Sequence, residues 1–469
     1  MNRYSRCGPN PARKHMTSTN IEEPSHAATP LPPPPPRPRP LAVPTRTLPL
    51  LAILIVTGSV MLIFASRTVH RWNTEELQKD ATAVRSHFQT TYWLEHGYFN
   101  SGGLLVYKSA TIPLFFYKSS TGGVYLAGFW VEKIYSAFTG HYSWRLMALQ
   151  NQIFTMIGSA VFALLGFRLA RLMGAEPLHA LMLAICLQAV HFTFPDNLMT
   201  YWEMSARIPW LLFACIFLLL EIETRKRRTR ALTIAQGFCA FALTYMEFVA
   251  GVTFVTSYLI AAILLSPDRP SWKRLFLISL VPMLLALGVF KVQLAWVRAT
   301  YPDVPLNGSE FLFRTGLDGS LKLYGDHLDI FRRRDVPRRD FIHSGEWAFR
   351  WKWLFLSSTA ALLWMLFLAM RGRIPATVTI SILSLLGAYL LYAALFSQAM
   401  VIHPYLYDVM IHTPLILVLF VIAPSFVETI SRHRGVAVVA IFFLAVWISM
   451  GQMRRYAVMY PEPPKQTQP

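Results

Sequence analysis

The sequence is poor in charged residues and in cysteine. Only 15% of its 469 residues are charged, 54% are hydrophobic, and the mean hydropathy is +0.39. Water-soluble globular proteins carry about 25% charged residues, so this composition excludes that class and indicates a membrane protein with several spans. The four cysteines have no metal-ligand spacing and imply no disulfide framework. We expect them to be small core residues.

Acidic residues are scarce relative to basic ones, with 25 Asp and Glu against 44 Lys and Arg and a formal net charge of +19. Such an excess can indicate a nucleic-acid partner, but the sequence has no basic-aromatic module of a known type. Membrane proteins gather Lys and Arg on cytoplasmic loops, which accounts for the excess. We therefore expect the membrane, and no nucleic acid, as the partner.

Residues 1–46 form a tail rich in proline. Proline lacks an N–H and fixes φ, so we expect a disordered or polyproline II segment in the cytoplasm. The apolar run that follows starts too late for a cleavable signal peptide and should remain as an anchor. We expect a transmembrane domain over 47–452 and a second tail over 453–469.

Apolar runs of near-bilayer length recur through this domain. They predict an all-α, polytopic transmembrane helix bundle with about eleven spans. The fifth and sixth runs are nearly continuous, and we expect a turn near 246–251. The runs lie at 48–66, 148–170, 177–194, 205–222, 231–248, 250–266, 274–295, 352–370, 374–396, 409–428 and 434–451.

Basic residues occur in alternate short loops. The loops 195–204, 248–251 and 397–408 hold almost none, so the positive-inside rule places them outside and the N-terminus in the cytoplasm. Both long loops, 67–147 and 296–351, then also lie outside. The loops on the cytoplasmic side contain Arg168, Arg171, Arg225, Lys226, Arg227, Arg228, Arg230, Arg269, Lys273, Arg274, Arg371, Arg373, Arg432 and Arg434.

The first long loop predicts two amphipathic helices that lie along the membrane surface, within 71–95 and 125–138. The second places Leu126, Phe129, Trp130, Ile134 and Phe138 at helical spacing. Glycines at 97, 102 and 103 allow tight backbone turns between the helices, and we expect a further turn at 119–123.

Acidic side chains occur near the predicted outer membrane boundary. Glu75, Glu76 and Asp80 follow the first run, and Asp196 and Glu203 lie close to the start of the fourth. A carboxylate there can act as a general base for a hydroxyl acceptor or bind a divalent metal. The alternatives are a solvated helix surface for the first three, and a helix cap with an intrahelical ion pair for the other two.

Cations and aromatic residues occur at the same expected depth. The runs Arg332–Arg334 and Arg338–Arg339 of the second long loop can bind phosphate, and Lys118 is a further cation of the first long loop. A cluster before a late span consists of His403, Tyr405, Tyr407, Asp408 and His412, and its His and Asp side chains can serve a lipid phosphate or a hydroxyl. The alternatives are a solvated charged face and the ordinary aromatic belt of membrane proteins.

The order of these features resembles the GT-C superfamily of integral-membrane glycosyltransferases, especially the bacterial protein mannosyltransferases and aminoarabinose transferases. The resemblance covers most of the chain from about residue 48 to 428, and the order of the motifs carries it. The matching pieces are the acids at 75–80, Leu-Glu-His-Gly at 94–97, Trp-Arg-Leu at 144–146 before span 2, Asp196, and residues 403–407 before a late span.

The resemblance implies an inverting transfer of a sugar from a polyprenyl-phosphate-linked donor to a lipid, glycan or protein acceptor, at the outer face of the bacterial inner membrane. It implies Asp80 or Glu76 as the base and Asp196 as a second acid. A divalent metal, Mg²⁺ or Mn²⁺, would bind Asp80 and Asp196 if one takes part. The expected substrate-binding residues are Glu75, Lys118, Glu203, Arg314, His403, Tyr405 and Tyr407.

Three other functions remain open from the sequence. A transporter or lipid flippase would need ionisable residues or broken helices at mid-membrane, and the spans have few. A ligase or polymerase of surface polysaccharide would share the long outer loops and the lipid-linked substrates. A non-catalytic membrane scaffold would tolerate alanine at every acid of these loops.

Overall fold

The fold is taken from a computed structural model of the chain. It describes residue 50 and the ranges 53–59, 81–107, 114–192, 203–224, 230–265, 269–304, 306–307, 345–395, 413–431 and 434–459. Contacts divide the chain into Met1–Arg46 and Thr47–Pro469. The first unit, which is the expected proline-rich tail, lies outside the described residues, and everything below concerns the second.

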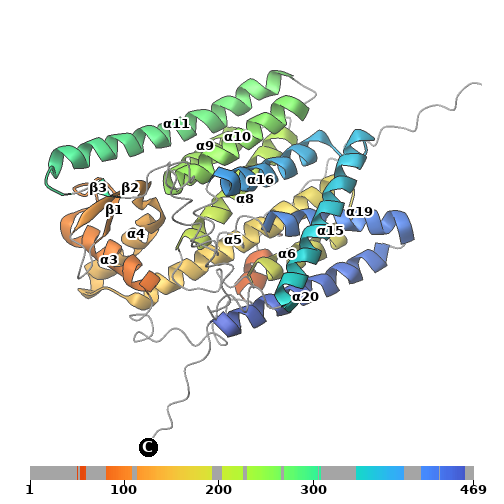
Figure 1. Cartoon of the computed structure of the whole chain (residues 1–469), viewed down its shortest axis with the longest axis horizontal. Helices are drawn as coiled ribbons and strands as arrows, with labels where there is room; N and C mark the ends of the chain where they lie inside the picture. Colours follow the sequence, from red (N-terminus) through yellow and green to blue (C-terminus); the bar gives the residue numbers. More distant parts are fainter. Residues whose placement is uncertain are drawn as a thin grey trace, which may run out of the picture. The chain divides into compact units, whose positions relative to one another are not determined.

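Helices make up most of the described residues, which confirms the all-α class (Figure 1). Each of the ten later apolar runs coincides with a described helix. Prediction works here because the length of an apolar run and its helical propensity both depend only on the residues of that segment. These helices are α5 (Trp144–Leu172), α6 (Pro177–Phe192), α8 (Glu203–Thr224), α9 (Arg230–Met246), α10 (Phe248–Leu265), α11 (Arg269–Thr300), α15 (Gly345–Met370), α16 (Ala376–Leu395), α19 (Thr413–Ser431) and α20 (Arg434–Met459).

Three described stretches are long and apolar enough to cross a membrane: Leu149–Leu172, Phe248–Leu265 and Phe276–Thr300. Other described helices contain shorter apolar stretches of 10–17 residues. Large apolar side chains also face outward on the bundle, such as Leu264 with 74% of its surface exposed and Val292 with 69%. Such surfaces fit contact with lipid, so the structure indicates membrane association.

Several predicted boundaries need correction. α5 begins at Trp144, earlier than the apolar run, so the Trp-Arg-Leu motif forms its first turn ahead of the membrane-length stretch that starts at Leu149. The hydroxyl of Ser143 accepts a hydrogen bond from the N–H of Leu146 at 3.2 Å and caps this helix. Arg168 and Arg171 also lie inside α5 instead of in a loop.

The ends of other helices also differ from the prediction. α11 continues to Thr300, past the expected start of the second long loop at 296, and α20 continues to Met459, past the expected start of the tail at 453. The turn expected near 246–251 is confirmed, because α9 ends at Met246, α10 begins at Phe248, and only Glu247 lies between them.

The bundle core is built from close helix contacts. α10 packs along α16, and α5 packs between α6 and α8 (Figure 1). Small residues permit this approach: a Cβ on Gly387 of α16 would lie 3.0 Å from the side chain of Ser257 on α10. Between helices in lipid, where both surroundings are apolar, tight packing of this kind supplies much of the attraction.

The first long loop folds into a compact group that we call the loop module. It consists of α3 (Ala81–His96), β1 (Leu104–Tyr107), β2 (Phe115–Thr121), a 3₁₀ helix η1 (Gly122–Tyr125), α4 (Leu126–Thr139) and β3 (Leu306–Asn307). The described helices α3 and α4 confirm helix formation over 81–95 and 126–138; residues 71–80 lie outside the described residues.

The small sheet of the loop module was not predicted. β1 pairs with β2 antiparallel, and β2 pairs with β3 in parallel through Phe116 with Leu306 and Tyr117 with Asn307. The turn expected at 119–123 is wrong for its first half, because Ser119 to Thr121 extend β2 and only the two glycines of η1 turn the chain. Since β3 belongs to the second long loop, the described start of that loop lies beside the described part of the first.

Candidate functional site

An aromatic cluster fixes the centre of the loop module. Trp93 of α3 is fully buried, and its ring lies 4.9 Å from that of Tyr98 and 5.9 Å from that of Phe129 on α4, both edge-on. A Cβ on Gly122 would lie 2.3 Å from ring carbons of Trp93 and 2.7 Å from the carbonyl oxygen of Gly103. Only glycine fits at position 122, so α3, η1 and the start of β1 meet at a fixed distance.

Hydrogen bonds connect the loop module to the bundle. The hydroxyl oxygens of Tyr98 and Tyr245 lie 2.8 Å apart, and Nε2 of Gln293 donates to the Tyr245 hydroxyl at 2.6 Å. Burial raises the pKa of Tyr98, and the neighbouring Tyr245 raises it further, so Tyr98 stays protonated. The end of α9 and the second half of α11 are thereby tied to the turn after α3.

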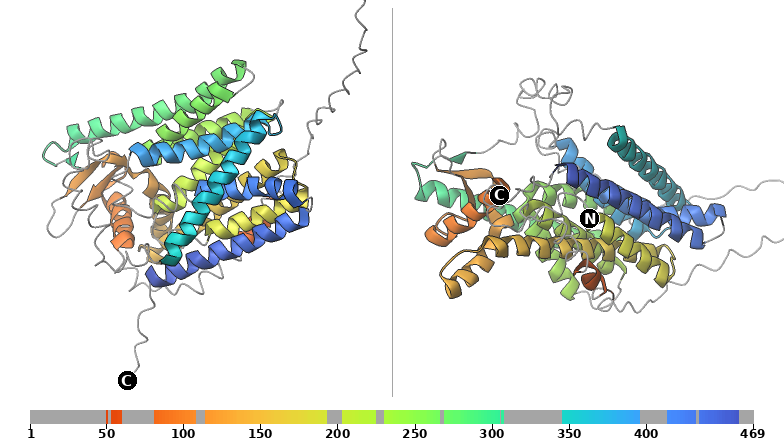
Figure 2. Two further views of the ribbon diagram at one scale, coloured as in Figure 1. Left: turned by 45° about the vertical axis from the view of Figure 1, so that its right-hand side comes forward. Right: turned by 90° about the horizontal axis from the view of Figure 1, so that it is seen from below.

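Glycines in the left-handed conformation make that turn, as predicted from the sequence. Gly97, Gly102 and Gly103 have φ values of 87°, 58° and 65°. A Cβ on Gly102 would lie 2.6 Å from Cγ2 of Val297 on α11. Around it, Leu104, Val106 and Phe116 of the strands pack against Phe290 and Val297 of α11, and Figure 2 shows the sheet beside the end of that helix.

Glu132 is a buried acid that the sequence reasoning missed. It lies on α4 with 1% of its surface exposed, and its Oε2 accepts a hydrogen bond from the backbone N–H of Ser143 at 3.0 Å. Its Oε1 is buried and has no partner among the described residues. Burial raises its pKa, and the hydrogen bond from Ser143 partly opposes this. The sequence contained one indication of this burial: Glu132 follows Gly128 by four residues, so the two lie on the same face of the helix.

Other polar side chains meet one helical turn from Glu132. A Cβ on Gly128 would lie 2.6 Å from Nε2 of Gln150 on α5 and 3.7 Å from Oγ1 of Thr90 on α3. Thr90 and Gln150 are both buried. The interior of the loop module is therefore polar where α3, α4 and α5 converge, and apolar around Trp93.

His87 links the start of α3 to the start of α5. Its imidazole stacks on the ring of Trp144 with 4.0 Å between centroids, and Tyr142 lies edge-on at 6.3 Å. Burial lowers the pKa of His87, so the imidazole is neutral at neutral pH. His87 follows the candidate base Asp80 by two helical turns in the sequence.

Most of the predicted site residues lie outside the described residues, so their mutual geometry stays a prediction. Asp80 directly precedes Ala81, the first residue of α3. Lys118 belongs to β2 and Glu203 begins α8, but the positions of these two side chains also lie outside the description. The residues that are not described are Glu75, Glu76, Asp80, Asp196, Arg314, His403, Tyr405 and Tyr407.

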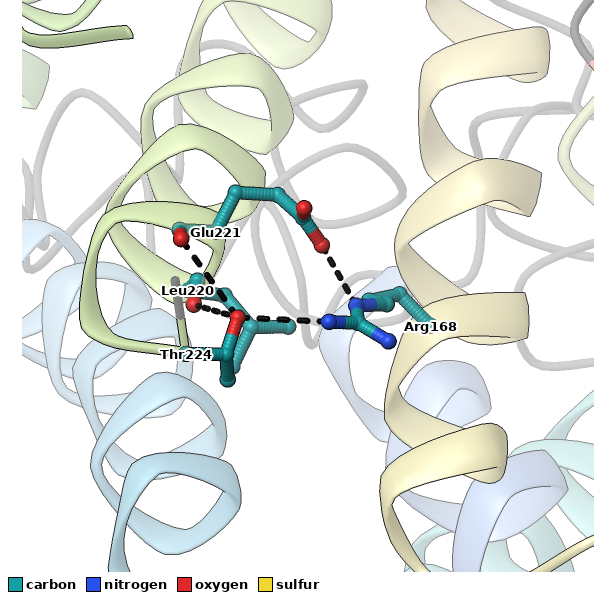
Figure 3. A network of polar contacts seen from close by, with 4 residues as sticks. All are labelled: Arg168, Leu220, Glu221 and Thr224. Atoms are coloured by element: carbon teal, nitrogen blue, oxygen red, sulfur yellow. Dashed lines mark hydrogen bonds and ion pairs between the residues drawn. The ribbon is translucent and has the colours of Figure 1, made fainter. Parts of the chain in front are cut away.

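The relative direction of two helices nevertheless shows at which end of the bundle the start of α8 lies. Arg168, close to the end of α5, forms an ion pair with Glu221, close to the end of α8, and its Nη2 donates to Oγ1 of Thr224 at 3.2 Å (Figure 3). Earlier in both helices, the rings of Phe154 and Trp210 stack with centroids 6.2 Å apart. α5 and α8 therefore run parallel, and the start of α8, at Glu203, lies at the end of the bundle that carries the loop module.

Among the side chains that the structure describes, no group of three or more His, Cys, Asp or Glu is placed to hold a metal ion, and Asp80 and Asp196 are not among them. The chain matches no protein-family model and no curated protein.

Proposed function

We propose that this protein is a membrane glycosyltransferase that moves a sugar from a polyprenyl-phosphate-linked donor to a lipid, glycan or protein acceptor. In this proposal the chain forms about eleven spans in a bacterial inner membrane, with the N-terminus in the cytoplasm and the loop module outside. One observation supports it most: β3 joins the second long loop to the first, and the sheet packs on the end of α11.

This arrangement suits a lipid-linked donor for a physical reason. The isoprenoid tail stays in the bilayer and the phosphate stays at the interface, so the reacting sugar is found where membrane helices meet outer loops. In this proposal the loop module takes that position, and three of its segments carry or adjoin candidate residues. Asp80 precedes α3, Lys118 lies on β2, and Arg314 follows β3 by seven positions in the sequence.

We propose Asp80, or Glu76, as the general base. It takes the proton of the acceptor hydroxyl, whose oxygen attacks the anomeric carbon from the face opposite the phosphate. The bond from the anomeric carbon to the phosphate oxygen breaks, and polyprenyl phosphate leaves with the electron pair. A single displacement inverts the anomeric configuration.

The remaining candidates would serve the substrates. Lys118, Arg314 and His403 would stabilise the charge on the leaving phosphate, since cations placed where charge develops lower the barrier. Tyr405 and Tyr407 would hold the donor at the interface. Glu75 and Glu203 would bind sugar or acceptor hydroxyls, and Asp196 is the proposed second acid. Mg²⁺ or Mn²⁺ on Asp80 and Asp196 remains part of the proposal.

The test is donor-lipid profiling by mass spectrometry in a deletion strain complemented with the full chain. We expect the deletion to accumulate a sugar-linked polyprenyl phosphate and the wild-type gene to remove it. Asp80→Asn or Glu76→Gln should slow transfer by roughly 10²-fold or more, the usual contribution of a general base. Asp303→Asn is the matched control, because Asp303 is an exposed acid of the loop after α11 and has no role in the proposal.

The possible outcomes test the proposed reaction and the proposed roles of the residues independently. If the deletion accumulates no such lipid, the proposed reaction is wrong. If it does accumulate, but Asp80→Asn, Glu76→Gln and Asp196→Asn all restore full transfer at wild-type protein levels, the assignment of the base is wrong. A parallel assay on isolated membranes with a metal chelator decides whether transfer needs a divalent cation.

A further inference from the structure

α11 lies at the edge of the bundle, with α9 and α10 as its main helix partners and the sheet of the loop module beside its last turns (Figure 1). The apolar segment of α11, within Phe276–Thr300, is 22% buried, whereas those of α5 and α10 are 61% and 56% buried. One long side of α11 is therefore left uncovered by the described helices, and in the proposed topology this side faces lipid.

Two cations lie on this uncovered side. The side chains of Lys291 and Arg298 are both exposed, and neither forms an ion pair or a hydrogen bond with another described residue. Seven residues make almost two full turns of an α-helix, so the two side chains leave the helix in nearly the same direction, about 10 Å apart along its axis. Ala295 is exposed between them. A small anionic group over Ala295 is within reach of both cations, because Lys and Arg side chains are long.

The same line of the helix becomes apolar toward the start of α11. Leu284 lies seven residues before Lys291, and Leu277 lies seven residues before Leu284; the two leucines are 53% and 58% exposed. Gly288 lies between the cations and the leucines, and a Cβ added there meets nothing within 4 Å. The line that we call the α11 stripe consists of Leu277, Leu284, Gly288, Lys291, Ala295 and Arg298. It presents charge at one end and apolar surface at the other, which suits an amphiphile with an anionic headgroup.

Two independent arguments place the cations near the outer boundary of the membrane. In the proposed topology α11 enters the bilayer from the cytoplasm near Arg274, and about 20 residues are needed to cross the hydrocarbon region, which leads to a position just past Lys291. The loop module, which lies outside in the same proposal, packs against Phe290 and Val297. Lys291 is therefore at the level of lipid phosphates, and the leucines of the stripe are at the level of lipid chains.

We propose that the α11 stripe binds polyprenyl phosphate, the lipid that the proposed transfer releases. The phosphate lies over Ala295 and accepts hydrogen bonds from Lys291 and Arg298, which are charge-assisted and therefore strong. The isoprenoid chain extends from there across Gly288 and along Leu284. This inference rests on the proposed function and adds two phosphate-binding residues to it.

Charge and length favour this lipid over an ordinary phospholipid. A phosphomonoester carries about 1.5 to 2 negative charges at neutral pH, which two cations balance, whereas the phosphodiester of phosphatidylglycerol carries a single charge. From Lys291 to Leu277 the stripe extends about 21 Å, which is more than the roughly 15 Å of one hydrocarbon leaflet. A long polyprenyl chain covers that length, whereas the acyl chain of a phospholipid ends near the middle of the bilayer.

The experiment is native mass spectrometry of the detergent-purified full chain with added undecaprenyl phosphate or phosphatidylglycerol. We expect the wild type to retain undecaprenyl phosphate preferentially, and Lys291→Gln and Arg298→Gln each to lower this retention roughly 10-fold, the effect of losing one charged hydrogen bond. Arg373→Gln is the charge-matched control, because Arg373 is an exposed arginine that precedes α16 and is not part of the stripe.

A second pair of variants tests the path of the chain. Gly288→Trp places a ring across the stripe without meeting another part of the protein, so it should reduce retention of undecaprenyl phosphate. Leu390→Trp, at an exposed position of α16 away from the stripe, should leave it unchanged. Equal retention of the two lipids by the wild type, or equal losses in Lys291→Gln and Arg373→Gln, overturns the proposal.

The binding assay and the deletion strain give separate answers. If the deletion accumulates a sugar-linked polyprenyl phosphate but Lys291→Gln and Arg298→Gln retain undecaprenyl phosphate as the wild type does, the α11 stripe is not the binding site and the proposed transfer stands. If the deletion accumulates no such lipid while both variants lose retention, the stripe is confirmed as a polyprenyl-phosphate site and the transfer is wrong.

Discussion

The loop module and the helix bundle are stabilised in different ways. In the bundle, small residues such as Gly387 and Ser257 let apolar helices approach, and Arg168 and Glu221 form a buried ion pair between α5 and α8. In the loop module, stacked rings and hydrogen bonds hold segments from two distant parts of the chain. In lipid, the hydrophobic effect contributes little to the packing of helices, whereas in water it stabilises the apolar interior of the loop module. The same kind of substitution should therefore have different effects in the two regions.

The largest effect is expected in the bundle. Glu221→Leu would leave Arg168, whose side chain is 12% exposed, without its carboxylate, while Glu221 itself is 1% exposed. An unpaired buried charge costs roughly 3 kcal/mol or more, so we expect a lower thermal unfolding midpoint in purified protein. The double variant Arg168→Leu with Glu221→Leu should recover much of the loss. A single variant as stable as the wild type would show that the pair does not stabilise the bundle.

A smaller effect, confined to the loop module, is expected from Gly122→Ala. The added Cβ meets the Trp93 ring and the Gly103 carbonyl, and overpacking of this kind costs about 1–3 kcal/mol. We expect faster limited proteolysis within the loop module and a shifted tryptophan emission. Gly288→Ala on α11 is the control, since a Cβ there meets nothing within 4 Å. Equal proteolysis of the two variants would contradict the proposed role of the Gly122 contact.

The smallest effect should depend on pH. Burial raises the pKa of Glu132 above its ordinary value of 4.5, so the folded protein binds this proton more tightly than the unfolded chain. The stabilising contribution of this proton is therefore complete below pH 4.5 and is lost as the pH rises through the raised pKa. Glu132→Gln keeps an acceptor for the Ser143 N–H and carries no charge, so it should raise the unfolding midpoint at neutral pH.

The measurement is the unfolding midpoint of wild type and Glu132→Gln as a function of pH. The advantage of the variant should shrink as the pH falls toward 4.5. Glu95→Gln, which changes an exposed carboxylate on α3, should give no such trend. A constant difference between wild type and Glu132→Gln over the whole range would show that the carboxylate does not titrate as proposed.

The sequence predicted the bundle helices well because each depends mainly on its own residues. The break at Glu247, the left-handed turns at Gly97, Gly102 and Gly103, and the helix from Leu126 were also predictable from spacing and residue type. The predicted number of about eleven spans stays a prediction, because the described helices include three that are long and apolar enough to cross a membrane. The candidate site also stays a prediction, since all of its acids except Glu203, the first residue of α8, lie outside the described residues.

Other features depended on contacts between segments far apart in the sequence. β3 has two residues, too few for any pattern of its own, and it exists because Leu306 and Asn307 pair with β2. The burial of Glu132 likewise follows from how α4 packs against α3 and α5. No short stretch of the sequence contains both members of either contact, so neither could be predicted from local residue patterns.

Apolar length, charge distribution and glycine placement by themselves determined that this chain is a helical membrane protein and where most of its helices lie. Only the tertiary structure decided that strands from the two long loops share one sheet and that an acid is enclosed within the first of these loops. The physical reason is that helix formation and hydrophobicity sum over neighbouring residues, whereas strand pairing and desolvation depend on which distant residues come into contact.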